Sequence, residues 1–494
     1  MKQLLLFCLA LLTLPSWVAG RVYPNTIDLE VNGLLISLQP WNLEASVVKG
    51  ENYYKTLFGD IQVPATVSYE GEEYRVVEIG CGAFCACPDI TSITLPEGIR
   101  KINPNAFELC SSLAHVNLPS SVRDVHSNIL LGTKWLEEQA DGLLCLDNVL
   151  LGWKGEMPAG THVDIPEGTR VVANSALDGI GLRPKSVSVP ESVEYLPMHS
   201  LGSSLDSVYM NVKSVGDGWF AFLSNLHKVA FGPSVRRIEN GAFIYSDRVH
   251  SVYTSGNIEY IGSENSLFNN LLLPSEDGMC YIDKVAYRFV GEAAGQTEVS
   301  LRAGIKSVGP YAFRNCRKLT SVKVPEEVEY IGYEAFQCCS SLTSVSLPAS
   351  LRQLETYAFD SCVSLRSIVL PSSLSTLYDS AFEGCTSVVD VISLAPEPPR
   401  LTSDYALYSS VFDKSWAEQC TLYVPLGSKP RYEDDPRLRA CFMDIVELDV
   451  SGISAPPASV SPPFFDLSGR RLSAPPARGI YIEDGQKRVA RGKE

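Results

Sequence analysis

Apolar and polar positions alternate in a phrase of about 23 residues that recurs along most of the chain. In its clearest copy, we expect Leu342, Val345 and Leu347 to point inward and the residues between them to point outward. Pro348 ends this predicted strand, because proline cannot donate to a central ladder. The segment Ala335–Cys339 has the spacing of a helix and predicts one short helical turn.

The period is marked by phenylalanines, and it is kept in three separate runs. These residues are Phe84 and Phe107, Phe220 and Phe243, and Phe313, Phe336, Phe359 and Phe382. A fixed period of this length is typical of a solenoid, in which each coil is apolar on one side and needs neighbours to cover that side. We therefore predict an α/β solenoid of about fourteen coils, each with one strand and a short helical turn.

The solenoid is expected to span residues 76–395, between an N-terminal β cap at 21–75 and a C-terminal cap at 396–448. Two atypical blocks within it, 141–177 and 277–313, align with each other without gaps. Alternating apolar residues and an opening Asp-Gly in each block predict a short hairpin.

Two further segments follow the predicted C-terminal cap. Residues 449–463 are rich in Pro, Ser and Ala, which predicts an extended linker. Residues 464–494 are again strand-like, with Asp484-Gly485 as a hairpin turn, and predict a small β module.

Charge and the N-terminus limit the location and the partners. The net charge of −16 argues against nucleic acid, whose phosphates require a basic surface, and against anionic membranes. Lys2, the apolar run Leu4–Leu14 and the small residues Val18–Gly20 predict a secretory signal peptide over residues 1–20. A buried N-terminal helix is the alternative. No later stretch is apolar for long enough to predict a transmembrane span.

Six of the cysteines occupy one slot of the repeat, three residues after its phenylalanine: Cys87, Cys110, Cys316, Cys339, Cys362 and Cys385. A small, buried, apolar side chain suits tight packing between coils, so we interpret them as buried thiols. Isolated disulfides, which exported proteins often contain, stay an alternative, and a metal site is the least favoured one.

No catalytic motif accompanies the repeat. The chain has no HExxH, GxSxG, P-loop or dinucleotide-binding sequence, and its six histidines are scattered singly. We therefore predict that the protein is not an enzyme and expect no catalytic, cofactor-binding or metal-ligating residues.

One group of surface residues stands out as a candidate ligand-contact patch. Aligned strands would bring Asp206, His227 and His250 into one outward column, and Tyr209 and Tyr253 into a second one. Tyrosine and histidine combine apolar area with a hydrogen-bonding tip, which suits binding to protein or sugar. The alternative is that these are ordinary solvent-facing positions.

The motif Ile-Gly-x-x-Ala-Phe-x-x-Cys-x-x-Leu-x-x-Val-x-Leu-Pro resembles the BspA-like leucine-rich repeat family of exported bacterial proteins. The resemblance implies a curved leucine-rich repeat solenoid on or outside the cell that acts in adhesion or partner binding. The tail, with Phe465-Asp466-Leu467-Ser-Gly469-Arg470 and Gly479-Ile480-Tyr481-Ile482, resembles the C-terminal sorting domain of type IX secretion substrates.

That second resemblance implies export to the surface of a diderm bacterium, or release from it. The ending Arg491–Glu494 lacks the usual apolar finish, so an inactive tail and a periplasmic protein form the alternative. Three functions follow as hypotheses: binding of a protein, such as a host-matrix or cell-surface protein; capture of a glycan by exposed Tyr and His; or a structural role in the cell envelope.

Overall fold

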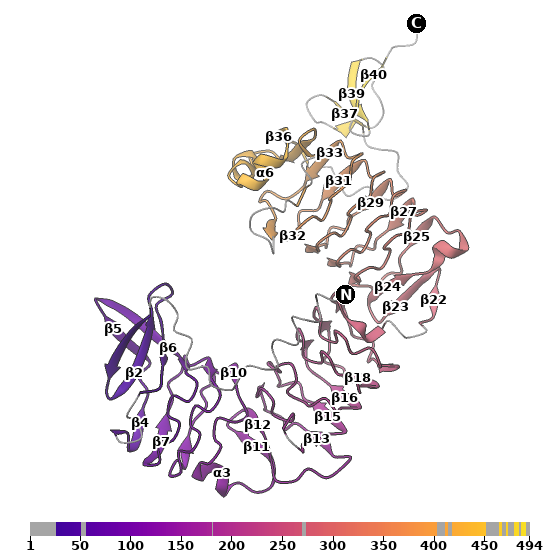
Figure 1. The fold of residues 1–494 in the computed structure, drawn as a ribbon. Helices are drawn as coiled ribbons and strands as arrows, with labels where there is room; N and C mark the ends of the chain where they lie inside the picture. Colours follow the sequence, from indigo (N-terminus) through magenta and orange to yellow (C-terminus); the bar gives the residue numbers. More distant parts are fainter. Residues whose placement is uncertain are drawn as a thin grey trace, which may run out of the picture. The chain divides into compact units, whose positions relative to one another are not determined.

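The computed structural model describes residues 26–50, 56–179, 181–268, 273–402, 411–412 and 417–450, and the backbone of four strands between 464 and 490 (Figure 1). The chain divides into two compact units, Met1–Val212 and Lys213–Glu494. The predicted signal peptide and residues 451–463 of the predicted linker lie outside the described residues. Within the described residues, no helix has both the length and the apolar character needed to cross a membrane.

The predicted solenoid is confirmed, but each regular coil contributes two short parallel strands, not one. Strand β27 (Ser321–Lys323) pairs with β29 (Ser344–Ser346) of the next coil, while β28 (Tyr330–Ile331) pairs with β30 (Gln353–Leu354). The second strands have only two or three residues in most coils, too few for an alternating pattern to reveal them.

We call these two series the first and second strand columns. In the first unit, the first column contains β4 (Gly59–Gln62), β7 (Ile90–Thr94), β9 (His115–Val116), β13 (His162–Asp164), β15 (Ser186–Val189) and β16 (Ser207–Met210). In the second unit it contains β18 (Lys228–Phe231), β20 (Ser251–Tyr253), β25 (Glu298–Ser300), β27, β29, β31 (Ser367–Leu370), β33 (Asp390–Ser393), β35 (Thr421–Pro425) and β36 (Asp444–Leu448).

The second column is built in the same way. In the first unit it contains β3 (Glu44–Val47), β6 (Glu72–Ile79), β8 (Lys101–Ile102), β10 (Asp124–Val125), β12 (Val149–Lys154) and β14 (Val171–Val172). In the second unit it contains β17 (Ser214–Val215), β19 (Arg237–Ile238), β21 (Tyr260–Ile261), β24 (Val285–Phe289), β26 (Ser307–Val308), β28, β30, β32 (Thr376–Tyr378) and β34 (Arg400–Thr402).

The remaining elements lie at the ends and at the two atypical blocks. At the start, β1 (Ile27–Val31) and β2 (Leu34–Gln39) form a hairpin beside β3, and β5 (Thr66–Tyr69) pairs with β6. The helical segments are α3 (Lys134–Glu138), η1 (Ser266–Phe268), η2 (Gly291–Ala294), α5 (Lys429–Glu433) and α6 (Pro436–Cys441). Near the C-terminus, β37 (Phe464–Asp466), β38 (Arg471–Leu472), β39 (Gly479–Glu483) and β40 (Gln486–Ala490) form an antiparallel sheet in the order β38-β37-β39-β40.

Both atypical blocks contain an antiparallel hairpin of matching geometry. In the first block β11 (Gly142–Leu146) pairs with β12, and in the second β23 (Met279–Ile282) pairs with β24. Each hairpin has a bulge at the same place, between Leu144 and Cys145 in one and between Cys280 and Tyr281 in the other. Strand β22 (Ser275–Glu276) extends the second hairpin.

The segment that the sequence predicted as a helical turn is instead a series of tight turns. The Phe336 N–H donates to the Ala358 carbonyl of the next coil at 2.7 Å, and the Cys338 N–H donates to the Asp360 carbonyl at 2.8 Å. Glu334 and Cys338 have left-handed backbones, with φ of 51° and 58°. A helix would use these N–H groups within the coil, so the bonds between coils exclude it.

The repeated phenylalanines form a continuous stack at the centre of the second unit. The ring centroids of Phe313, Phe336, Phe359 and Phe382 follow one another at 4.9, 4.9 and 5.5 Å, with nearly parallel planes. All four side chains are fully buried. Close approach of the coils also explains the glycine of the motif, because a Cβ on Gly332 would lie 2.8 Å from the Pro310 backbone nitrogen.

The alternation predicted for the strand at Val345 is wrong in one position. Ser346, expected to face solvent, is only 9% exposed, and Val345 is half-buried. The chain turns toward the core where this strand ends, and Leu347 and Pro348 are buried there as well.

The cysteine slot has a more specific role than small size. The six cysteines of the slot are buried and unbridged, as the buried-thiol interpretation predicts. The Cys339, Cys362 and Cys385 thiols donate to the carbonyl of the phenylalanine one coil earlier, at 3.1 to 3.2 Å. In the coil where serine replaces cysteine, the Ser246 hydroxyl makes the same bond to the Phe220 carbonyl at 2.6 Å. In these coils the slot therefore holds a small hydrogen-bond donor, whereas Leu223 fills it in the coil of Phe220.

Removal of one ring from the stack tests its contribution to the core. Phe336→Ala should lower the free energy of unfolding by about 3–5 kcal/mol, because it leaves a cavity between two close-packed coils. Urea unfolding followed by circular dichroism measures this loss, with the exposed Lys323→Ala as control. A loss under about 1 kcal/mol would contradict the burial of this ring.

Two substitutions of one slot cysteine separate the contribution of its hydrogen bond from that of its side-chain volume. Cys362→Ala removes the thiol donor from the buried Phe336 carbonyl, which keeps the Cys339 N–H at 3.2 Å, and should destabilise by about 1 kcal/mol. Cys362→Ser keeps a donor, as Ser246 does naturally, and should lose less. Equal losses for the two variants in the same urea assay would refute the role of the S–H donor.

A buried acid in β33 predicts a pH dependence of stability. Asp390 is 9% exposed, and burial raises the pKa of its carboxyl to about 6. Because the folded state binds this proton more tightly than the unfolded state, the contribution of Asp390 to stability is most favourable below about pH 4 and is lost as the pH rises through 6. Asp390→Asn should remove this slope and stabilise the protein at pH 7 by roughly 1–3 kcal/mol.

Urea unfolding at several pH values between 4 and 7.5 provides the measurement, with the exposed Asp434→Asn as control. The Asp390 variant and the unmodified protein should differ most at pH 7.5. A constant difference across this range would show that the Asp390 carboxyl does not titrate there.

Candidate ligand-contact surfaces

The predicted contact patch is divided between the two units. Asp206 and Tyr209 lie at β16 in the first unit, while His227, His250 and Tyr253 lie at β18 and β20 in the second. The Tyr209 and Tyr253 side chains are 43% and 64% exposed, so both rings are available to a ligand.

Within the second unit, the predicted column of histidines is present. Strands β18 and β20 pair in register, and the His227 and His250 ring centroids lie 5.5 Å apart at an angle of 38°. Tyr253 lies opposite Ala230 on the same strands. The His250 Nδ1 is 3.0 Å from the Ser251 Oγ, so a hydroxyl helps to orient the ring. The sequence alignment of strands thus placed these residues correctly, while their role in binding stays a prediction.

A second exposed aromatic pair was missed by the sequence reasoning. Phe222 and Tyr245 each lie two residues after a repeated phenylalanine, Phe220 or Phe243, at left-handed turn positions with φ of 60° and 57°. Their rings stack at 5.0 Å between centroids, yet the two side chains are 48% and 59% exposed. An aromatic residue at this slot is the signal that could have found them, because the other coils fill it with the non-aromatic residues Ala86, Leu109, Asn315, Cys338, Ser361 and Gly384.

The second strand column of the second unit carries a cluster of one arginine and two tyrosines. The Arg237 guanidinium lies 4.0 Å from the Tyr260 ring centroid and 5.0 Å from that of Tyr330, and it pairs with Glu239 at 2.9 Å. The two tyrosine rings meet edge to face at 5.4 Å, although two strands of the second column, β24 and β26, come between β21 and β28. Tyr260 is 5% exposed, and burial, followed by the nearby Glu355 carboxylate, raises its pKa.

This arginine–tyrosine cluster is therefore part of the packing of the second unit. The cluster joins side chains from coils that are not adjacent. Among the described residues, no group of three or more His, Cys, Asp or Glu side chains is placed to hold a metal ion.

Comparison with known proteins agrees with this architecture. The model of the BspA type leucine rich repeat region matches in six copies, over residues 72–139, 159–273 and 286–397, which is more than half of the chain. The chain belongs to the BspA-type leucine-rich repeat family. This BspA-type protein has two unmatched internal stretches: 140–158 contains β11 and β12, and 274–285 contains β22 and β23.

Solved structures similar to this BspA-type protein are leucine-rich repeat proteins of low sequence identity. A leucine rich cell surface protein from Faecalibacterium prausnitzii is 20% identical, covering 87% of this chain and 98% of its own, with a TM-score of 0.25. The pneumococcal vaccine antigen PcpA is 15% identical, covering 86% and 99%, with a TM-score of 0.29.

A leucine-rich repeat protein from Bacteroides ovatus is 19% identical and covers 87% of this chain and 100% of its own, with a TM-score of 0.23. No curated protein matches the chain significantly. Because these TM-scores are low, the function has to be argued from the residues of this chain.

Proposed function

We propose that this protein is a non-enzymatic leucine-rich repeat protein, exported to the cell surface or secreted, that binds protein partners through its central coils. Export is supported by the signal-peptide pattern of residues 1–20. Binding of proteins suits a solenoid, whose stacked coils offer an extended surface.

The observation that carries this proposal is the exposed Phe222–Tyr245 pair. A bulky residue in the left-handed region costs on the order of 1 kcal/mol, whereas glycine or asparagine adopts it easily. Both positions also expose aromatic area to water. Two aromatic rings that stack on each other at exposed positions suit an interface, where aromatic side chains dominate the binding energy.

The predicted patch adds to this surface in the same coils. Tyr253 follows Tyr245 along one coil, and His250 lies between them in sequence. Among the described residues, aromatic side chains at least 36% exposed are Trp41, Phe58, Tyr209, Phe222, Tyr245, Tyr253 and Tyr311. Most of these residues fall between positions 209 and 311, where the repeat is irregular. We therefore assign partner contact to the central coils, with Asp206 and Tyr209 as candidates in the first unit.

Surface plasmon resonance against purified extracellular-matrix proteins, run beside a glycan array, tests the proposal. At least one protein should bind, and the double variant Phe222→Asn/Tyr245→Asn should weaken this binding about tenfold or more. Asparagine suits the left-handed backbone, so the fold should be kept. Tyr253→Ala should weaken binding as well, and the exposed Leu426→Ala serves as control.

Two outcomes would contradict the proposal. Protein binding that survives both aromatic variants would remove the central coils from the interface. Binding confined to the glycan array, and lost in Tyr253→Ala, would favour glycan capture instead, because an exposed tyrosine ring can stack on a sugar.

A further inference from the structure

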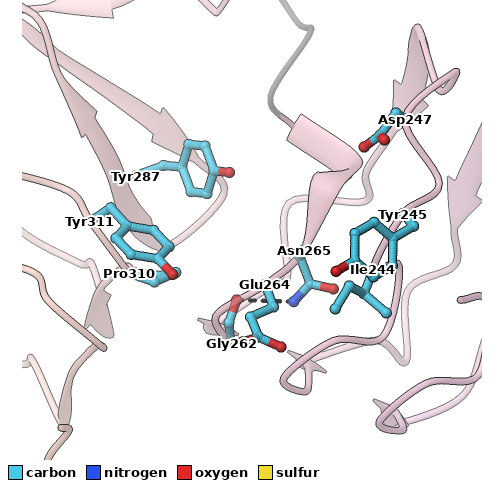
Figure 2. Close-up of a pocket in the computed structure, with 9 residues that line it drawn as sticks. All are labelled: Ile244, Tyr245, Asp247, Gly262, Glu264, Asn265, Tyr287, Pro310 and Tyr311. Atoms are coloured by element: carbon cyan, nitrogen blue, oxygen red, sulfur yellow. Dashed lines mark hydrogen bonds between the residues drawn. The ribbon is translucent and has the colours of Figure 1, made fainter. Parts of the chain in front are cut away.

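A pocket of about 420 Å³ opens in the second unit beside Tyr245. Its lining comes from four successive coils: Ile244, Tyr245, Asp247, Gly262, Glu264, Asn265, Tyr287, Pro310 and Tyr311. Figure 2 shows Tyr287 and Tyr311 on one side of the opening, and Glu264, Asn265 and Tyr245 on the other. The pocket therefore lies where the second hairpin interrupts the regular stacking of coils.

The matching place in the first block explains why the pocket is open. There, the Asn174 N–H donates to the Val125 carbonyl at 2.8 Å, and the Ser127 N–H donates to the Asn174 carbonyl at 3.1 Å. These bonds join the coils on either side of the hairpin. In the second block the residue that corresponds to Asn174 is Pro310, which has no N–H to donate.

The neighbouring groups of the second block find other partners. The Ser263 N–H, which corresponds to that of Ser127, donates to the Asn240 side-chain oxygen at 2.9 Å. The Asn265 Oδ1 accepts the Phe243 N–H at 3.0 Å, in place of the next coil's carbonyl. Its Nδ2 donates to the Glu239 and Gly262 carbonyls at 2.9 Å. The Asn265 side-chain amide is therefore held in place by hydrogen bonds within the protein, on both its oxygen and its nitrogen.

The tyrosines and carboxylates of the lining give the pocket an aromatic and anionic character. Tyr287 is 7% exposed, and its ring is held edge-to-face against Phe268 at 5.4 Å. Tyr311 is 36% exposed, and burial, with the carboxylates of Glu334 and Glu264, raises its pKa and keeps the phenol neutral. Asp247 and Glu264 are exposed and add two carboxylates to the lining.

Two cations lie next to the tyrosines. The Arg314 guanidinium is 5.4 Å from the Tyr311 ring centroid and pairs with Glu334 at 2.9 Å. The Arg288 guanidinium is 5.7 Å from the Tyr287 ring centroid. Neither arginine lines the pocket, so the lining itself carries negative charge only.

We propose that this pocket binds an arginine side chain presented by the protein partner. A guanidinium is planar, always charged and a donor only, so it can stack on tyrosine rings while it donates to carboxylates. The net charge of −16 also favours a basic segment of the partner. The inference rests on the proposed function, because Tyr245 belongs to both the aromatic pair and the pocket.

Titration of the full mature chain with L-argininamide, measured by calorimetry, tests the pocket without the partner. L-citrullinamide is the neutral probe of the same shape, and it should bind about tenfold more weakly or not at all. Glu264→Gln should weaken argininamide binding about tenfold, whereas Glu327→Gln, an exposed carboxylate outside the pocket, should leave it unchanged.

A second variant tests the origin of the opening. Pro310→Asn restores the residue type of the closed block and should reduce argininamide binding, while the circular dichroism spectrum and the unfolding midpoint stay close to those of the unmodified chain. Retained affinity in this folded variant would contradict the proposed role of Pro310.

Equal affinity for argininamide and citrullinamide, or no effect of Glu264→Gln, would overturn the assignment of a cation to the pocket. Preferential binding of a neutral sugar such as N-acetylglucosamine would overturn it in favour of a glycan. Phe222→Asn separates the two proposals, because it should weaken partner binding but leave argininamide binding intact. If Phe222→Asn leaves partner binding unchanged, the proposed role of the aromatic pair is refuted, while the assignment of an arginine to the pocket is not.

Discussion

The backbone hydrogen bonds between the tight turns of successive coils hold the rest of this structure together. The repeated phenylalanines donate their N–H groups to the next coil, as Phe313 does to the Ala335 carbonyl at 2.7 Å. Where the next coil has a cysteine in the slot, the carbonyl accepts its thiol, as that of Phe313 does from Cys339. The backbone of the phenylalanine is therefore satisfied on both sides while its ring fills the core. A change of period would leave these buried groups without partners, which explains why the spacing is so regular.

Where a hairpin interrupts the stack, this constraint has to be met in another way. Asn265 supplies a side-chain oxygen to the Phe243 N–H at the point where a regular coil would supply a carbonyl. At the corresponding place in the first unit, the Phe107 N–H still donates to a backbone carbonyl, that of Ile129, at 3.1 Å. The irregular coils therefore carry residues chosen for local hydrogen bonding, and they also carry the unusual surface chemistry. Regular coils repeat one surface and offer little specificity, so a partner that binds at a unique position has to use the interruptions.

The sequence predicted the solenoid and the buried thiols, because each depends on a residue type that recurs at one spacing. It did not predict the tight turns, since positions three and four apart share a face in a helix and also lie together in such a turn. The residues Phe222 and Tyr245 were missed for a related reason. They read as further apolar residues of a coil until the left-handed backbone shows that their slot points outward. The position of His227 beside His250 could be predicted, because coils of equal length place corresponding residues of parallel strands next to each other.

The pocket could not have been predicted from the period, because it depends on a difference between two copies of one block. Asn174 and Pro310 occupy corresponding positions, and the hairpins beside them share the same bulge. The change from a donor to a proline removes one backbone bond between the flanking coils, which stay joined by the Ser307 hydroxyl to the Glu259 carbonyl at 2.7 Å, and tyrosines and carboxylates line the space beside them. A duplicated block whose hairpin geometry is kept, while its junction opens, has retained its scaffold and changed its surface. The arrangement favours a binding role for the second copy, because an unfilled gap of this size would otherwise only reduce packing.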